Sequence, residues 1–205
     1  MRERELIFTA RILSKVFNPF YLPIVGLTGL LTFSYLNLLP WKYKFFLIFT
    51  FWLFTIFMPT AMIRIYRNYN GWSPIQLGKK ERRAIPYLIS IISYLSCCYF
   101  MAAVHVPRFM GSIIIAALVV QVTCAVTNIF IKISTHMAAI GGVTGALVAF
   151  AFIFSFNPVW WLCVVIILAG LVGTSRMTLR QHSLNEVLLG FVTGTVCSFL
   201  SVIIY

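Results

Sequence analysis

The feature that most constrains this chain is a repeated alternation between long apolar segments without charge and short clusters of charged side chains. A helix needs about 20 apolar residues to cross the hydrocarbon core of a bilayer, and most of these segments have that length. Of the 205 residues, 61% are hydrophobic and 10% are charged, whereas a soluble domain carries about a quarter charged residues. The sequence therefore predicts an all-α, polytopic membrane helix bundle.

The intervals without charge predict six to seven spans. The first helix is expected within 16–41, beginning near Phe20, and the others are expected at 45–63, 84–107, 109–131, 137–156, 158–174 and 187–205. The segment 158–174 is the shortest, and Asn157-Pro158 separates it from the span before it. Residues 1–17 carry apolar side chains near helical spacing with basic residues between them, which is typical of an interfacial amphipathic helix.

Two pairs of glycines have the spacing that lets membrane helices pack closely. Gly141 and Gly145 share one helix face, and Gly190 and Gly194 share another. Asn128 and Gln121 are polar residues within a predicted span. We expect them to form hydrogen bonds between helices, although they would also suit the wall of a cavity.

The net charge is +12, but the basic residues are confined to short segments between apolar runs, where they cannot form a continuous groove for a nucleic acid. Cations in such places suit membrane phosphates or a phosphorylated substrate better. The chain contains no aspartate, so a carboxylate-rich metal site is not expected. The expected partners are therefore membrane lipids and not nucleic acid, and the sequence leaves the oligomeric state open.

Three polar clusters, at 79–83, 132–136 and 175–186, interrupt the apolar pattern. Two predicted spans separate the first cluster from the second, and two more separate the second from the third. Two spans return the chain to the side from which it started. All three clusters are therefore expected at one face of the membrane, as a single composite site would require.

The third cluster, SRMTLRQHSLNE, holds His182 and Glu186, which share a face if this segment is helical. A carboxylate bound to one imidazole nitrogen fixes the tautomer and makes the other nitrogen a better base or nucleophile. We expect a turn at 175–181 and a helix from about His182. Arg176 would then lie beside a helix start, where free N–H groups favour an anion.

The other two clusters add groups of the same kind. Ser134-Thr135-His136 offers hydroxyls and a second histidine at a predicted helix start, and KKERR at 79–83 offers four cations. Histidines, cations and helix N-termini on one face would suit a phosphate under nucleophilic attack, because the cations can neutralise its oxygens.

These residues resemble the motifs of the type-2 phosphatidic acid phosphatase superfamily. Ser175-Arg176, His182 and Glu186 resemble the third motif, S-R-x5-H-x3-D, with glutamate in place of aspartate. Ser134-Thr135-His136 resembles the second motif, P-S-G-H, with Ile133 for the proline and Thr135 for the glycine. Lys79 to Pro86 resembles the first motif, K-x6-R-P, with the arginine displaced to Arg82 or Arg83. The resemblance covers about 79–190, and the motif-bearing core of a single membrane domain, 1–205, would be about 79–205.

The resemblance implies metal-independent hydrolysis of a lipid phosphomonoester or pyrophosphate, with no cofactor. His182 would attack phosphorus and form a phosphohistidine, and Glu186 would orient it. His136 would protonate the leaving oxygen and then activate water. The phosphoryl oxygens would be held by Lys79, Arg82, Arg83, Ser134, Thr135 and Arg176.

The resemblance also implies a multi-pass protein of the cell (inner) membrane with an extracytoplasmic site. The positive-inside rule favours the opposite orientation, because only Lys42, Lys44 and Arg108 lie on the face away from the motifs. We favour the extracytoplasmic site. An alternative function is a non-enzymatic lipid-phosphate binder or transporter that retains the phosphate site.

Overall fold

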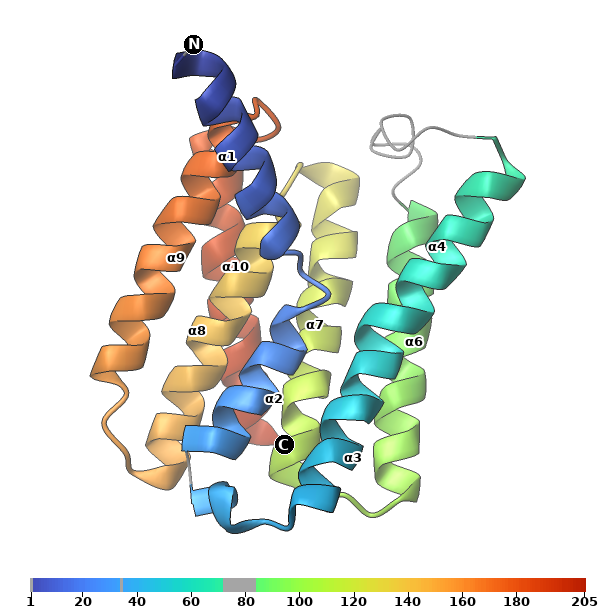
Figure 1. Ribbon diagram of the computed structural model, residues 1–205, viewed down its shortest axis with the longest axis vertical. Coiled ribbons are helices and arrows are strands. Elements are labelled where there is room, and N and C mark those ends of the chain that lie inside the picture. Colours follow the sequence, from blue (N-terminus) through green and yellow to red (C-terminus); the bar gives the residue numbers. More distant parts are fainter. Residues whose placement is uncertain (1, 34, 72–83) are drawn as a thin grey trace.

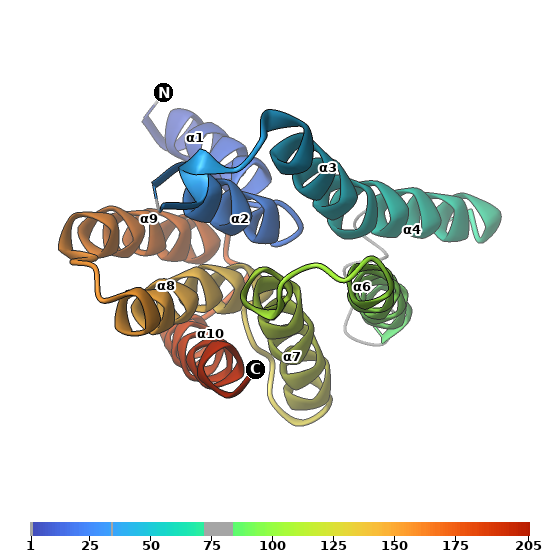
Figure 2. The same ribbon diagram turned by 90° about the horizontal axis from the view of Figure 1, so that it is seen from below.

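The computed structural model describes residues 2–33, 35–71 and 84–205, and all regular structure in these ranges is helical. In chain order the elements are α1 (Arg2–Val16), α2 (Leu22–Phe33), the 3₁₀-helix η1 (Tyr35–Leu38), α3 (Trp41–Phe51), the π-helix η2 (Trp52–Phe57), α4 (Met58–Tyr69), α6 (Ala84–Ala103), α7 (Arg108–Phe130), α8 (Thr135–Phe154), α9 (Val159–Thr178) and α10 (Leu184–Ile204). The helix α8 packs against α2, α7, α9 and α10, as Figures 1 and 2 show. The predicted all-α bundle is confirmed.

Six helices in the described ranges are long and apolar enough to cross a membrane. The first is the continuous segment Trp41–Tyr69, and the others are Ile85–Ala103, Arg108–Phe130, Thr135–Phe154, Val159–Thr178 and Leu184–Ile204. They correspond to the predicted spans from 45–63 onward. The chain is therefore a multi-pass membrane protein.

The helix within 16–41 is shorter than a full span, although α1 and α2 together carry the chain from one end of the bundle to the other (Figure 1). The helix α2 has 12 residues, which at 1.5 Å per residue gives about 18 Å, less than the ~30 Å hydrocarbon core. The chain then turns through η1, where the Lys44 ammonium donates hydrogen bonds to the backbone oxygen (2.6 Å) and side-chain oxygen (2.8 Å) of Asn37. Lys44 belongs to α3, so this polar contact joins η1 to α3 after α2 has ended, and α2 is shorter than the predicted interval.

The four predicted glycines bring α8 and α10 into backbone contact. A Cβ atom at Gly194 would lie 1.9 Å from the carbonyl oxygen of Ala138, and one at Gly145 would lie 2.1 Å from that of Thr195. Gly141 and Gly190 meet the facing backbone in the same way. Only glycine permits this approach, so the predicted small-residue faces are confirmed.

The two side-chain amides of α7, Gln121 and Asn128, hydrogen-bond to α6. The Gln121 amide donates to the Ser90 hydroxyl at 2.7 Å, and the Asn128 amide donates to the Tyr87 hydroxyl. The Asn128 side-chain oxygen also accepts the Ile133 N–H at 3.3 Å, which fixes the segment between α7 and α8. The expectation of hydrogen bonds between helices is confirmed.

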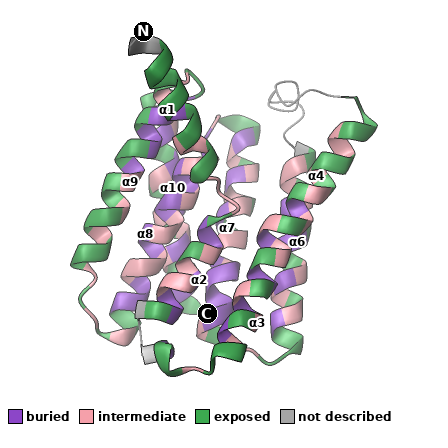
Figure 3. Cartoon of the chain, in the orientation of Figure 1, coloured by how far each residue is buried: buried purple, intermediate pink, exposed green. Residues whose placement is uncertain are grey.

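Residues coloured as buried are concentrated where the helices pack together, and exposed residues occupy much of the outer surface of the bundle (Figure 3). One buried cluster joins α2, α8, α9 and α10 through Leu22, Met137, Val172 and Val187. It lies near the end of the bundle where α8 and α10 begin and α9 ends. This apolar layer supports the two segments that carry the second and third polar clusters.

Candidate active site

The second and third polar clusters lie at one end of the bundle, between α7 and α8 and between α9 and α10 (Figure 1). The described chain on either side of the first cluster, at the end of α4 and the start of α6, reaches the same end. Lys79, Arg82 and Arg83 lie outside the described residues. The shared face is therefore confirmed for the second and third clusters.

The helix α9 continues through Arg176, which lies in its last turn. The predicted turn at 175–181 was therefore placed too early, because the chain leaves the helix only after Thr178. The next helix begins at Leu184 with Ser183 as its N-cap, so His182 precedes the helix instead of starting it.

The end of α9 is formed by two backbone hydrogen bonds and one residue in the left-handed conformation. Arg180 has a φ of 51°, in the left-handed region, and its N–H donates to the Met177 carbonyl at 2.8 Å. The Gln181 N–H donates to the Arg176 carbonyl at 3.1 Å. These two bonds form a Schellman motif, a common helix ending. The motif turns the chain so that His182 follows at the start of α10.

His182 and Glu186 form the central pair of the candidate site. The Nδ1 of His182 lies 2.8 Å from Oε2 of Glu186. A carboxylate only accepts, so Nδ1 carries the proton of this bond and Nε2 of the neutral imidazole keeps its lone pair. The Ser183 hydroxyl accepts from the Glu186 N–H at 3.4 Å, and Glu186 accepts from the Ser183 N–H at 3.3 Å, so a capping box holds the carboxylate.

Lys132 joins this pair from the segment between α7 and α8. Its ammonium lies 3.5 Å from Oε2 of Glu186 and donates a hydrogen bond to the Gln181 carbonyl. The Ser134 N–H donates to the Glu186 backbone carbonyl at 3.2 Å, which fixes the same segment to the start of α10. The second and third clusters are therefore joined by direct contacts.

Burial lowers the pKa of His182 to about 4, and the positive charges of Arg176 and Lys132 act in the same direction, while the hydrogen bond to Glu186 opposes them. The side chain is only 3% exposed. The imidazole is therefore neutral at pH 7, the form that can act as a nucleophile or base.

The start of α8 contributes unsatisfied polar atoms. Ser134 is its N-cap and Thr135 is its first residue, but the Ser134 side chain makes no capping hydrogen bond. Within the described part of the chain, the buried Ser134 Oγ and His136 Nδ1 have no hydrogen-bond partner. Buried polar atoms without partners are rare and often mark a place for a ligand or water.

The N-terminal helix α1 covers this end of the site. It packs against α9 (Figure 1), and its Ser14 hydroxyl accepts a hydrogen bond from the Arg176 guanidinium at 2.7 Å. The Ser14 carbonyl oxygen lies 3.2 Å from Nε2 of His136, so that nitrogen carries the proton. His136 is also within electrostatic range of Arg176 and His182. Ser14 therefore accepts hydrogen bonds from His136, which the sequence predicts for catalysis, and from Arg176, which it predicts for phosphate binding.

Lys132 and Ser14 are site residues that were not predicted. Lys132 directly precedes the Ile133 to His136 segment, so its position beside the second motif was a usable signal. No pattern in residues 1–17 distinguishes Ser14, because only the packing of α1 on α9 brings it to Arg176. Within the described residues, no group of three or more His, Cys, Asp or Glu side chains could hold a metal ion.

Comparisons of the chain with protein-family models, with curated proteins and with solved structures give no match.

Proposed function

We propose that this protein is a membrane-embedded, metal-independent lipid phosphatase that hydrolyses a lipid phosphomonoester or pyrophosphate through a phosphohistidine. The observation that carries the proposal is the 2.8 Å contact between Glu186 and Nδ1 of a buried, neutral His182. The motif resemblance adds to it, because the third motif contributes both of these residues. Arg176 and Lys132 give positive charge for the phosphoryl group, and in this proposal Lys79, Arg82 and Arg83 add to it.

In the first step, the Nε2 lone pair of His182 forms a bond to phosphorus while the bond from phosphorus to the leaving oxygen breaks. His136, which is neutral in the free protein, takes up a second proton as the negatively charged phosphate binds, and it gives that proton to the leaving oxygen. In the second step, His136 takes a proton from water, the water oxygen bonds to phosphorus, and the N–P bond breaks. Inorganic phosphate and the dephosphorylated lipid are the products, and both histidines return to their starting forms.

The unpartnered Ser134 Oγ and the N–H groups at the start of α8 suit the phosphoryl oxygens. Arg176 would exchange its hydrogen bond to Ser14 for one to the phosphate. Glu186 has one more methylene than the aspartate of the motif, but its contact with His182 has the expected length. The alternative, a lipid-phosphate binder without turnover, would use the same groups.

The proposal is tested by measuring phosphate release from a panel of purified lipid phosphates, with the full-length protein in detergent. Release from at least one lipid, inhibited by vanadate and unchanged by EDTA, is the expected result. Tight binding of a lipid phosphate without any release from the panel would instead favour the binder or transporter. Loss of activity in EDTA would contradict the metal-free mechanism.

We place the site on the extracytoplasmic side of the cell membrane, as the resemblance implies. The N-terminus lies at the same end of the bundle as the site and the C-terminus at the other end (Figure 1). A protease added outside spheroplasts should therefore remove a tag from the N-terminus and leave a C-terminal tag intact. The reverse result would place the site in the cytoplasm, as the positive-inside rule favours.

The pH dependence of kcat/KM should report the neutral form of His182. Protonation of His182 removes the attacking lone pair, so we expect kcat/KM to fall about tenfold per unit below about pH 4. A separate fall at higher pH would report loss of the proton that His136 must donate. In Lys132→Met, one cation that lowers the pKa of His182 is missing, so the acid-side fall should begin at higher pH. The titration of the substrate phosphate, near pH 6 for a monoester, is measured separately. A fall beginning near the ordinary histidine value of about 6.5 would contradict the prediction.

A further inference from the structure

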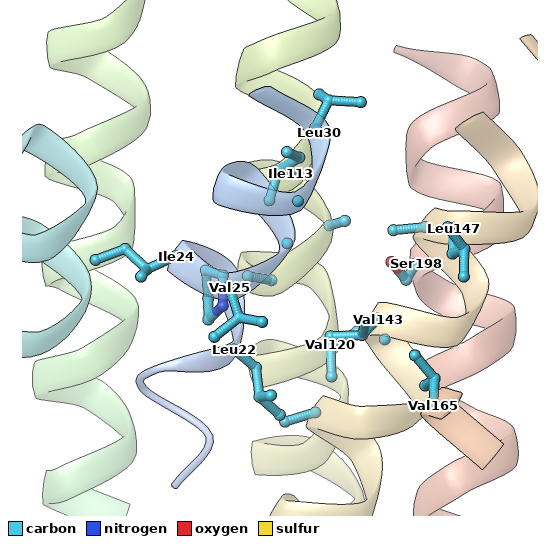
Figure 4. A pocket seen from close by; sticks show the side chains of 18 of the residues that line it. Leu22, Ile24, Val25, Leu30, Ile113, Val120, Val143, Leu147, Val165 and Ser198 are labelled. Carbon is cyan, nitrogen blue, oxygen red and sulfur yellow. The ribbon is translucent and has the colours of Figure 1, made fainter. Parts of the chain in front are cut away.

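A cavity of about 530 Å³ lies within the bundle, and nearly all of its lining is apolar. Its walls come mainly from α2, α7, α8 and α9, with Ser198 from α10. Figure 4 shows Leu22, Val25 and Leu30 on one side of the space and Val143, Leu147 and Val165 on the other. Its volume lies in the ~300–1,000 Å³ range of ligand pockets.

The cavity begins beside the candidate active site. Thr135, which lines it, stands between Ser134 and His136 at the start of α8. Its other lining residues on α8 recur along one helix face as far as Phe150. These 15 helical steps correspond to about 22 Å, which exceeds the ~15 Å depth of one leaflet. The cavity is therefore long and narrow, with its only described cluster of phosphate-binding groups at one end.

The cavity also reaches the side of the bundle that faces lipid. Val25 of α2 and Val164 of α9 line it, yet they are 54% and 49% exposed. Val25 lies in the first turn of α2 and Val164 lies five residues inside the apolar span α9, so this opening falls within the depth of the hydrocarbon core. A molecule that enters there comes from the bilayer and must be apolar.

We infer that this cavity binds the apolar chain of the lipid whose phosphate lies at His182. The inference rests on the proposed function, because that function supplies the phosphate at the Thr135 end. The occupant is a lipid phosphate with an acyl or prenyl chain at least as long as one leaflet is deep. Its chain enters between α2 and α9 and lies along α8, and its phosphate reaches the start of α8.

A glycine in the cavity wall allows the binding site for the lipid chain to be filled by a substitution, and a second glycine outside the cavity provides the control. Gly29 of α2 lines the cavity and an added Cβ atom there meets nothing within 4 Å, so a leucine side chain at this position is expected to occupy part of the cavity. Gly170 of α9 also has nothing within 4 Å, but it is exposed and does not line the cavity. Gly29→Leu and Gly170→Leu are therefore a matched pair.

The test measures binding without turnover, in the full-length His182→Ala protein in nanodiscs. The probe is a long-chain alkyl phosphate with bromine on its chain, and the readout is quenching of Trp161, which lines the cavity. The signal from Trp161 is the difference from a protein that also carries Trp161→Phe. We expect quenching that Gly29→Leu weakens by about tenfold or more, the loss expected when about two methylene groups are excluded. Gly170→Leu should leave it unchanged.

Two results would overturn the inference. The first is absent quenching of Trp161, or quenching that Gly29→Leu leaves unchanged. The second is equal affinity for the brominated alcohol without phosphate, because the chain would then bind independently of the site. Failure of the proposed function would be seen separately, as no phosphate release from any lipid by the parent protein.

Discussion

Gly194→Ala should prevent α8 and α10 from packing as they do in the native protein. The added Cβ atom would lie 1.9 Å from the Ala138 carbonyl oxygen and 2.7 Å from its carbonyl carbon. Both are backbone atoms of a helix, so no side chain can rotate away to make room. The helices must separate, and we expect the loss of stability to reach the upper end of overpacking effects, about 3 kcal/mol or more.

The same change should reach the candidate site. The Ser134 N–H donates to the Glu186 carbonyl, and a Cβ atom at Gly190 would lie 2.6 Å from the Ser134 carbonyl oxygen. The glycine face therefore sets the distance between the start of α8 and the start of α10. If α10 moves outward, Glu186 and His182 move with it, so phosphate release should be lost together with stability.

The measurement is the midpoint of thermal unfolding in detergent, with Gly170→Ala as the control. An added Cβ atom at Gly170 meets nothing within 4 Å, so this variant should unfold at the native midpoint or slightly above it. The increase would come from the higher helix propensity of alanine, which is worth up to about 1 kcal/mol over glycine. A native midpoint in Gly194→Ala would show that the backbones of α8 and α10 are not in contact in the protein.

The helices were largely predictable because each span is an apolar interval bounded by charge or proline, and the bilayer fixes its length. The α8–α10 contact was also predictable, since glycines four residues apart have few other uses in a membrane helix. The length of α2 was not. The contact between Lys44 and Asn37 turns the chain inside an interval without charge, and no local pattern signals it.

The central pair of the site was predictable for a similar local reason. Glu186 lies four positions after His182, and a capping box at Ser183 holds the carboxylate even though His182 precedes the helix. The surroundings of Arg176 were not predictable. The helix α9 runs past Arg176 and ends at the Schellman motif that contains Arg180, and α1 places Ser14 against the guanidinium. The helix end depends on a left-handed residue that is not glycine, and the position of Ser14 depends on the packing of α1 against α9.

His182→Ala should abolish phosphate release, with a loss of at least ~10⁴-fold in kcat, because removal of a nucleophile leaves only the charges that stabilise the transition state. The histidine is almost fully buried but makes its hydrogen bond to the more exposed Glu186, so the fold should tolerate its removal better than it tolerates Gly194→Ala. An unchanged unfolding midpoint would assign the loss to chemistry.

Two variants separate this role from a structural one. His105→Ala removes an exposed histidine between α6 and α7, at the end of the bundle away from the site, and should keep full activity. Glu186→Gln keeps a hydrogen-bond acceptor near Nδ1 but removes the charge that stabilises the imidazole during attack. We expect it to retain part of the activity, with a loss of about 10²–10⁴-fold.

Detection of the phosphohistidine intermediate tests the role of His182 as the nucleophile directly. With a ³²P-labelled lipid phosphate and an alkaline quench, the parent protein should carry label that is stable to base and lost in acid, as expected for a phosphorus–nitrogen bond. His182→Ala should carry none, and His136→Ala should accumulate label if its slower step is the attack of water. Label retained in His182→Ala, or hydrolysis at the parental rate, would show that another group attacks phosphorus. The Glu186 contact would then have only the structural role of capping α10.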